Sequence, residues 1–148
     1  MIIYVDADAC PVTEDIIKLC EPYQLTIILV KSYAHFSHRL YHEWIKEIYV
    51  DSEKEAVDYK ILSMINKGHV LVTQDYGLAS LALQKSCYVI HPKGFQYTSK
   101  NIDQLLASRY HSAQLRKQGG RTKGPKPFVQ EDHERFQTVF TKLLSTII

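Results

Sequence analysis

Acidic side chains stand where two short apolar runs end, a position from which they could act together. Asp6 follows the run 2–5, with Asp8 two residues further on, and Asp75 follows the run 70–73. If both runs are parallel strands, their carboxyl ends meet at one edge of the sheet, where open α/β sheets bind ligands. We therefore expect Asp6, Asp8 and Asp75 to lie close together.

A second acidic pair lies in a stretch that favours a helix. Glu55 and Asp58 are three residues apart near the start of 53–66, so they share one helix face. If this helix reaches the same sheet edge, four or five carboxylates converge, and they raise one another's pKa unless a cation lies among them. An oxygen-only ligand set suits Mg²⁺ or Mn²⁺. The pattern predicts a divalent-metal site that could activate water against a phosphodiester.

Each acid also has a structural alternative. Asp6 and Asp8 could be turn residues after a strand, and Asp75 could be a turn or helix-cap residue. Glu55 and Asp58 could form a solvated face near a helix N-terminus, where the helix dipole favours acids. For any single acid the structural role is the simpler explanation. The combination of two strand ends and one helix face favours metal binding.

Positive charge is concentrated in the last third of the chain. The net charge is +2, but residues 101–148 carry eight Lys or Arg and only four Asp or Glu. Such a segment is either a solvated surface loop or a surface that binds an anionic polymer. Beside an acidic metal site it would hold the phosphates of a nucleic acid, and Tyr97 and Tyr110 could stack on unpaired bases. The candidate phosphate-binding residues are Arg109, Arg116, Lys117, Arg121, Lys123 and Lys126.

The cysteines and histidines give weaker signals. The three cysteines are scattered without a CxxC pair, which argues against a disulfide scaffold or a thiolate zinc site. Cys10 lies at an expected helix start, where a partly buried cap residue is favoured over a reactive thiol. His35, His38 and His42 would align on a helix and could bind a transition metal. Because that stretch lacks helix signals, a loop lining the mouth of the site is favoured.

The elements that must position these residues alternate between strand and helix. Helical patterns lie at 11–20, 53–66 and 78–84, and β-prone runs lie at 2–5, 25–30, 48–50, 70–73 and 87–90. Continuous apolar runs such as 25–30 are typical of strands buried on both faces. The alternation predicts an α/β fold with a mostly parallel central sheet flanked by helices.

The C-terminal part departs from this alternation. Residues 117–127 contain three Gly and two Pro, and the basic residues extend around them, so we expect a basic loop over about 109–128. Apolar residues from Phe136 to Ile147 then recur at helical spacing. This predicts an amphipathic helix over about 131–147 that packs on the domain or on a partner, so a homo-oligomer is one possibility.

Size and composition fit one globular domain over 1–148. With 45% apolar and 23% charged residues, the chain is not expected to be disordered. No apolar run reaches the ~18 residues of a membrane span, so no membrane partner is expected. No secretory signal is expected either, which makes the cytoplasm the default location.

Four segments resemble the motifs of one known family. They are YVDADACPV at 4–12, EKEAVD at 53–58, VTQDYGLA at 72–79 and KGPKPF at 123–128. In this order they are similar to the motifs of the bacterial YaiI/YqxD family, whose biochemical activity is not established. The opening motif is specific, and the resemblance covers nearly the whole chain. The family is grouped by fold with PIN-like (and NYN-like) nuclease domains.

This resemblance implies a PIN-like domain whose acids hold a divalent metal and cleave RNA. It assigns Asp6, Asp58 and Asp75 to the metal, with Asp8 beside them. Many family members have Gly-x-Asp-x-x-Asp where this chain has Glu-Lys-Glu-Ala-Val-Asp. Glu55 keeps the first carboxylate but lengthens it by a methylene, so Asp58 is the stronger candidate ligand.

Three functions are compatible with these observations. The first is a Mg²⁺- or Mn²⁺-dependent ribonuclease in which Asp6, Asp8, Asp58 and Asp75 are catalytic. The second is a protein that binds nucleic acid without cleaving it. The third is an aspartyl phosphatase with Asp6 as nucleophile and Asp8 as acid and base; the absence of a downstream Gly-Asp-x-x-x-Asp motif makes it the least favoured.

Overall fold

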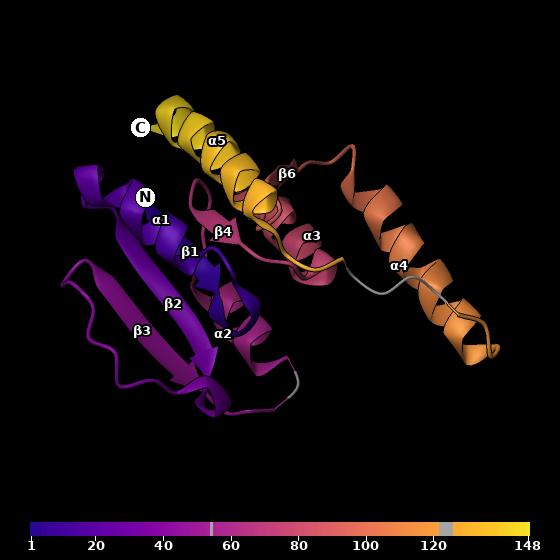
Figure 1. Cartoon of the computed structure of the whole chain (residues 1–148). Helices are drawn as coiled ribbons and strands as arrows, with labels where there is room; N and C mark the ends of the chain where they lie inside the picture. The colour runs from indigo at the N-terminus through magenta and orange to yellow at the C-terminus, as the bar shows by residue number, and fades with distance from the viewer. Residues whose placement is uncertain (54, 122–125) are drawn as a thin grey trace.

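A computed structural model of the chain describes residues 1–53, 55–121 and 126–148 (Figure 1). Within these residues, six strands form one sheet in the order β3-β2-β1-β4-β5-β6. Neighbouring strands are parallel except for the β5–β6 pair, so the expected α/β fold with a mostly parallel sheet is confirmed. The strands are β1 (Ile2–Asp6), β2 (Thr26–Ser32), β3 (Ile45–Val50), β4 (Val70–Val72), β5 (Tyr88–His91) and β6 (Phe95–Tyr97).

The strand order reverses next to β1, which creates the place for a site. The chain leaves β1 toward β2 on one side, whereas β4 lies against the other side of β1. Val5 is paired with Val72, so the residues that follow each strand emerge at the same level. In open α/β sheets, ligands bind at the carboxyl ends of the strands at such a reversal.

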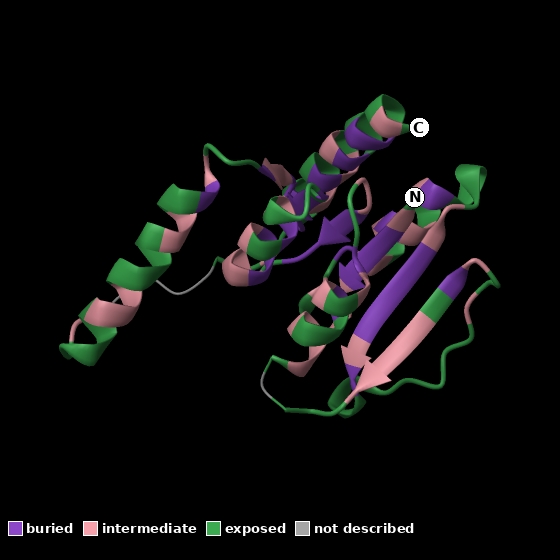
Figure 2. Cartoon of the chain, turned by 180° about the vertical axis from the view of Figure 1, so that it is seen from behind, coloured by how far each residue is buried: buried purple, intermediate pink, exposed green. Residues whose placement is uncertain are grey.

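Helices cover both faces of the sheet because β1 alternates its side chains between them. Ile3 and Val5 pack in one core with α1 (Thr13–Cys20) and α5 (Gln130–Ile147), which lie side by side. Tyr4 packs on the opposite face with α2 (Ala56–Met64) and α3 (Tyr76–Gln84). Figure 2 shows buried residues on the inward surfaces of these helices and along the central strands.

The C-terminal helix lies within one residue of the bounds expected from the sequence. Its apolar stripe, which includes Phe136, Phe140, Leu143 and Leu144, is buried against the sheet and α1. Of the two predicted partners for this helix, its own domain is the one that buries the apolar stripe. None of the described helices is long and apolar enough to cross a membrane.

The expected basic loop over about 109–128 is wrong in its first half, because the chain is helical over α4 (Ile102–Lys117). Leu, Ala, Gln and Arg are good helix formers, and the break comes only at Gly119, whose φ is +80°. Only the start of α4 packs firmly: Ile102 is buried, and Leu105 and Leu106 contact the core next to α3. The rest of α4 is largely exposed and lies apart from the sheet (Figures 1 and 2). A weakly packed helix has little hydrophobic periodicity, which is why the sequence did not reveal it.

Two glycines with left-handed backbone allow a matched test of this packing. A Cβ at Gly94 (φ +91°), in the turn between β5 and β6, would lie 2.6 Å from the Arg135 carbonyl carbon and 2.7 Å from the Phe136 nitrogen. A Cβ at Gly68 (φ +84°) would meet nothing within 4 Å. We expect Gly68→Ala to cost about 1–2 kcal/mol of unfolding free energy, from the backbone alone. Gly94→Ala should cost clearly more, because α5 must move.

Urea unfolding of both variants and the wild type measures this difference. Equal losses for the two variants would show that the β5–β6 turn does not press on the α5 backbone.

Candidate functional site

All five acids singled out from the sequence line one cavity at the carboxyl edge of the sheet. The cavity measures about 290 Å³ and is lined by residues from the ends of β1 and β4 and the start of α2. Glu53, which sequence reasoning did not select, also lines it. Among the lining residues in the described part of the chain, Arg109 is the one cation. The charged lining residues are Asp6, Asp8, Glu53, Glu55, Asp58, Asp75 and Arg109.

Thr73 links the ends of the two central strands. Its buried hydroxyl donates to Asp6 Oδ2 at 2.8 Å and accepts from the backbone N–H of Asp75 at 3.0 Å. Burial raises the pKa of the Asp6 carboxyl, and the charges of Asp75 and Asp8 add to this effect, while the Thr73 hydrogen bond opposes it. Thr73 is a positioning residue that a search for acids alone could not find; its place directly after β4 is the only sequence signal.

Asp75 has a structural role as well as a place in the cavity. It is the N-cap of α3, and its Oδ1 accepts from the backbone N–H of Leu78 at 3.0 Å. The same oxygen lies 3.6 Å from Nη1 of Arg109. The helix-cap alternative for Asp75 is thus correct, and it fixes the carboxylate so that it faces the other acids.

Asp58 carries the largest electrostatic cost in the site. It lies in the first turn of α2, and its pKa is raised from 3.8 to about 7, first by burial and then by the charges of Asp75, Asp6 and Glu55. A hydrogen bond with Asp75 contributes in the same direction. Burial and the neighbouring carboxylates thus favour the protonated form of Asp58, which relieves part of the negative charge in the site.

Glu55 begins α2 from a strained backbone conformation. It is the N-cap residue with φ +69° and ψ 4°, a left-handed geometry that costs a residue with a Cβ about 1–2 kcal/mol. Strain of this kind persists where the surrounding structure enforces it, often at functional sites. The longer Glu side chain at this position is exposed, whereas Asp58 is half-buried.

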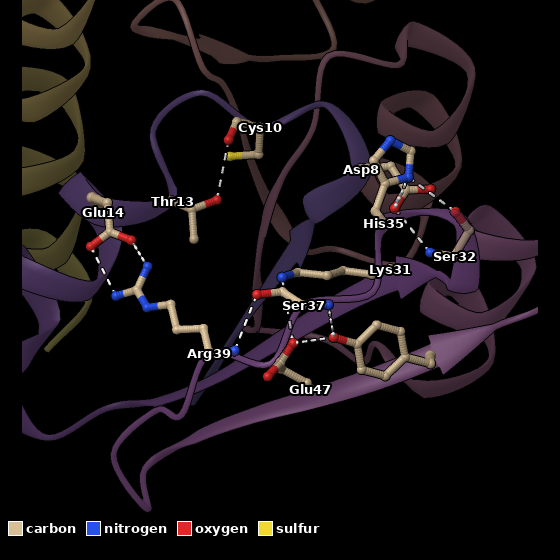
Figure 3. A network of polar contacts seen from close by, with 11 residues as sticks. Asp8, Cys10, Thr13, Glu14, Lys31, Ser32, His35, Ser37, Arg39 and Glu47 are labelled. Atoms are coloured by element: carbon tan, nitrogen blue, oxygen red, sulfur yellow. Dashed lines mark hydrogen bonds and ion pairs between the residues drawn. The ribbon is translucent and has the colours of Figure 1, made fainter.

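Asp8 points toward β2 and organises the segment that follows it. Its Oδ1 accepts from the backbone N–H of Ser32 at 2.9 Å and lies 3.1 Å from Nδ1 of His35 (Figure 3). His35 ends the 3-10 turn Tyr33–His35, and residues 36–42 are not helical. The alignment of His35, His38 and His42 on a helix is therefore wrong. The favoured loop is present, but none of these histidines is among the residues that line the acidic cavity; His35 only contacts Asp8.

The donor set suits a hard cation, but its placement does not yet form a binding site. Carboxylates are the ligands that Mg²⁺ and Mn²⁺ prefer. Over residues 1–53, 55–121 and 126–148, however, no three His, Cys, Asp or Glu side chains are grouped so as to hold a metal ion. A cation would have to draw Asp6, Asp58 and Asp75 closer together, so the metal site stays a prediction.

The predicted phosphate-binding residues separate into different places. Arg109, in the middle of α4, lines the acidic cavity. Arg116 and Lys117 occupy the last turn of the same helix, about 10 Å further along its axis. Arg121 and Lys126 are exposed beyond the helix, and Lys123 lies outside the described residues.

Three other predictions concern single side chains. Tyr97 is 1% exposed, so its predicted stacking on bases is wrong; its hydroxyl instead donates to the Thr73 carbonyl at 3.1 Å. Tyr110, on α4, is 62% exposed. Burial raises the pKa of the Cys10 thiol to about 11, which keeps it protonated and fits the expected structural role.

The raised pKa of Asp58 predicts a pH dependence of stability. Between its unfolded and folded values the native protein keeps a proton that the unfolded chain has lost, so the free energy of unfolding falls as pH rises through about 4 to 7. Asp58→Asn removes this loss. We expect the variant to melt several degrees above the wild type near pH 8, because each kcal/mol raises the melting temperature of a domain of this size by about 2–4 °C. Near pH 4 the two should melt alike.

Thermal unfolding followed by circular dichroism across this pH range provides the measurement. Asp51→Asn, at an exposed loop position, removes the same charge and serves as the control. A constant offset between Asp58→Asn and the wild type at all pH values would contradict the assignment.

Comparison with known proteins agrees with the motif resemblance. Residues 4–146 match the family described as "Uncharacterized BCR, YaiI/YqxD family". A UPF0178 protein of Bacillus anthracis is 51% identical over 98% of this chain and 99% of its own length. One from Oceanobacillus iheyensis is 52% identical over the same shares.

Among solved structures, Rae1 (YacP) of Bacillus subtilis aligns over 100% of both chains, with a TM-score of 0.42 and 16% identity. That similarity is loose, and the strand order given above defines the fold independently of it. The family match and the relatives are decisive for ancestry: this chain belongs to the YaiI/YqxD family.

Proposed function

We propose that this protein is a divalent-metal-dependent nuclease that hydrolyses RNA phosphodiester bonds. The observation that supports the proposal best is the cavity at the strand-order reversal, where five predicted acids and Glu53 surround a single described cation. Such an excess of carboxylates is costly without a bound cation, as the raised pKa of Asp58 indicates. The choice of RNA rests on the resemblance of the motifs to those of proteins grouped with PIN-like nucleases.

The residues of the chain have distinct tasks in this proposal. Asp6, Asp58 and Asp75 would hold Mg²⁺ or Mn²⁺, which when bound would activate water and offset charge on the phosphate. Thr73 keeps Asp6 and the start of α3 in register through its two hydrogen bonds. Asp8 fixes the segment after β2, so its role is positioning. Glu55, exposed at the cavity, could add a ligand or hold a water.

Arg109 and the rest of α4 would bind the substrate backbone. Arg109 lies close enough to Asp75 to contact a phosphate held beside the acids. The last turn of α4 offers further positive charge from Arg116 and Lys117, at a distance that suits a neighbouring phosphate. A reducing cytoplasm is the location we propose, since all three cysteines are free.

The central test is loss of cleavage without loss of the fold. Asn caps a helix about as well as Asp, so Asp75→Asn should keep α3 intact while removing a charge from the site. We expect Mn²⁺-dependent cleavage of a labelled single-stranded RNA to fall by roughly 10- to 100-fold or more. Millimolar Mn²⁺ should raise the melting temperature of the wild type, and Asp6→Asn should abolish this rise.

Asp103→Asn, on the exposed first turn of α4, serves as the matched control and should retain both responses. Equal cleavage by Asp75→Asn and the wild type, in equally pure preparations, would refute the nuclease assignment.

The alternative that an observation favours is nucleic-acid binding without catalysis. It is supported by the lack, among the described residues, of a ready group of metal ligands. In that case RNA affinity would fall steeply with salt, because binding releases counterions, while no divalent ion would support turnover. Turnover of p-nitrophenyl phosphate would instead indicate the aspartyl phosphatase.

A further inference from the structure

A second cavity opens beside the acids, between α2, α3 and α4. It measures about 360 Å³ and shares Glu55, Asp58, Asp75 and Arg109 with the acidic site. Its remaining wall is mostly apolar and is formed by Tyr59, Leu62, Leu78 and Leu81, with Gly77 and Ser80. We propose that this cavity is a subsite for one unpaired nucleobase of the RNA strand. The inference rests on the proposed function and adds to it a place for the base next to the attacked phosphate.

The apolar wall is accessible where one would expect it to be covered. Tyr59 is 69% exposed and Leu81 is 46% exposed, although the chain has two well-filled cores on either side of its sheet. Tyr59 follows Asp58 directly on α2, so an acid and an aromatic ring reach the cavity from neighbouring positions. An accessible aromatic ring beside a phosphate-handling site is suited to stacking on a base, whatever its identity.

Gly77 lines the apolar cavity next to Asp75 and Arg109, which line both cavities. It lies in the first turn of α3, and a Cβ there would come within 3.2 Å of Asp75 Oδ1 and 3.9 Å of Arg109 Nη1. Any side chain at this position would therefore crowd the two residues that the cavities share. A glycine in a helix is otherwise unfavourable by about 1 kcal/mol relative to alanine. The space that a glycine leaves beside Asp75 and Arg109 gives that cost a reason.

The polar groups at the rim match the two parts of a nucleotide. Arg109 contributes a guanidinium for the phosphate, as arginine does in many nucleic-acid complexes. Glu55, exposed at this rim, contributes oxygens that can accept from the N–H groups on the edge of a base. The volume is near the lower end for small-ligand pockets, so it suits a single ring system better than a protein segment.

The experiment compares a short oligouridylate with an oligomer of the same length that lacks its bases. Binding is measured by fluorescence anisotropy at one salt concentration, with Ca²⁺ in place of Mn²⁺ to suppress cleavage. We expect the wild type to bind the base-bearing strand at least about fivefold more tightly, as one stacked base would give. Tyr59→Ala should reduce the ratio of the two affinities to near one. Tyr59→Phe, which keeps the aromatic ring, should retain the wild-type ratio. Gly77→Val should also remove the preference, because the larger side chain would occupy space in the cavity beside Asp75 and Arg109.

Tyr23→Ala, at a tyrosine that is 52% exposed far from these helices in sequence, serves as the control and should keep the wild-type preference. Both Tyr59 variants should fold, since the side chain is largely exposed; circular dichroism verifies this.

Equal affinity of the wild type for the two oligomers, no binding of either, or a full preference retained by Tyr59→Ala would overturn the subsite. A base preference without metal-dependent cleavage would sink the nuclease but keep the subsite. Metal-dependent cleavage without a base preference would support the nuclease and overturn the subsite.

Discussion

Parallel pairing of β1 with β4 is the constraint on which the site depends. Opposing Val5 and Val72 brings Asp6 and Thr73 out of the sheet together, and Thr73 then bonds both Asp6 and the backbone at Asp75. A slip of one residue would turn Asp6 to the other face of the sheet and bury an unpaired charge. Ile3, Val5 and all of β4 are fully buried, so such a slip would also disrupt close packing on both faces of the sheet. The core of the protein thus sets the spacing of its acids.

The site concentrates negative charge that the fold only partly offsets. Thr73 stabilises Asp6, the α3 N-terminus and Arg109 stabilise Asp75, and the raised pKa of Asp58 favours its protonated form. Arrangements of this kind reduce stability and are retained where the charges serve a purpose. The same helices that bring the acids together leave an apolar wall uncovered next to them. Charge and apolar surface in one opening are what a nucleotide, with its phosphate and base, requires.

Sequence reasoning recovered the sheet and the acids because both have strong local signals. Buried parallel strands are continuous apolar runs, and strand ends point to one edge, so Asp6 and Asp75 could be paired without coordinates. It failed for α4, whose single packed turn leaves no periodicity, and for the short antiparallel strand β6. It also missed Thr73, Tyr59 and Gly77, since a lone hydroxyl, an exposed ring and a glycine acquire meaning only from their neighbours in space. The predicted base stacking of Tyr97 was wrong for the same reason, because nothing in the local sequence shows that this side chain is buried.

Asp75 both caps α3 and lines the acidic cavity, and this affects how the sequences of relatives should be interpreted. A chain that had lost all chemistry would still need an oxygen at this position to satisfy the Leu78 amide, so evolution would retain Asp or a similar residue there. An aspartate at position 75 in a relative is therefore weak evidence that the relative is active. An aspartate at position 58, where the surroundings raise the pKa of the carboxyl, is the stronger evidence. If the proposed nuclease activity were lost in a related chain, Asp58 should be replaced before Asp75.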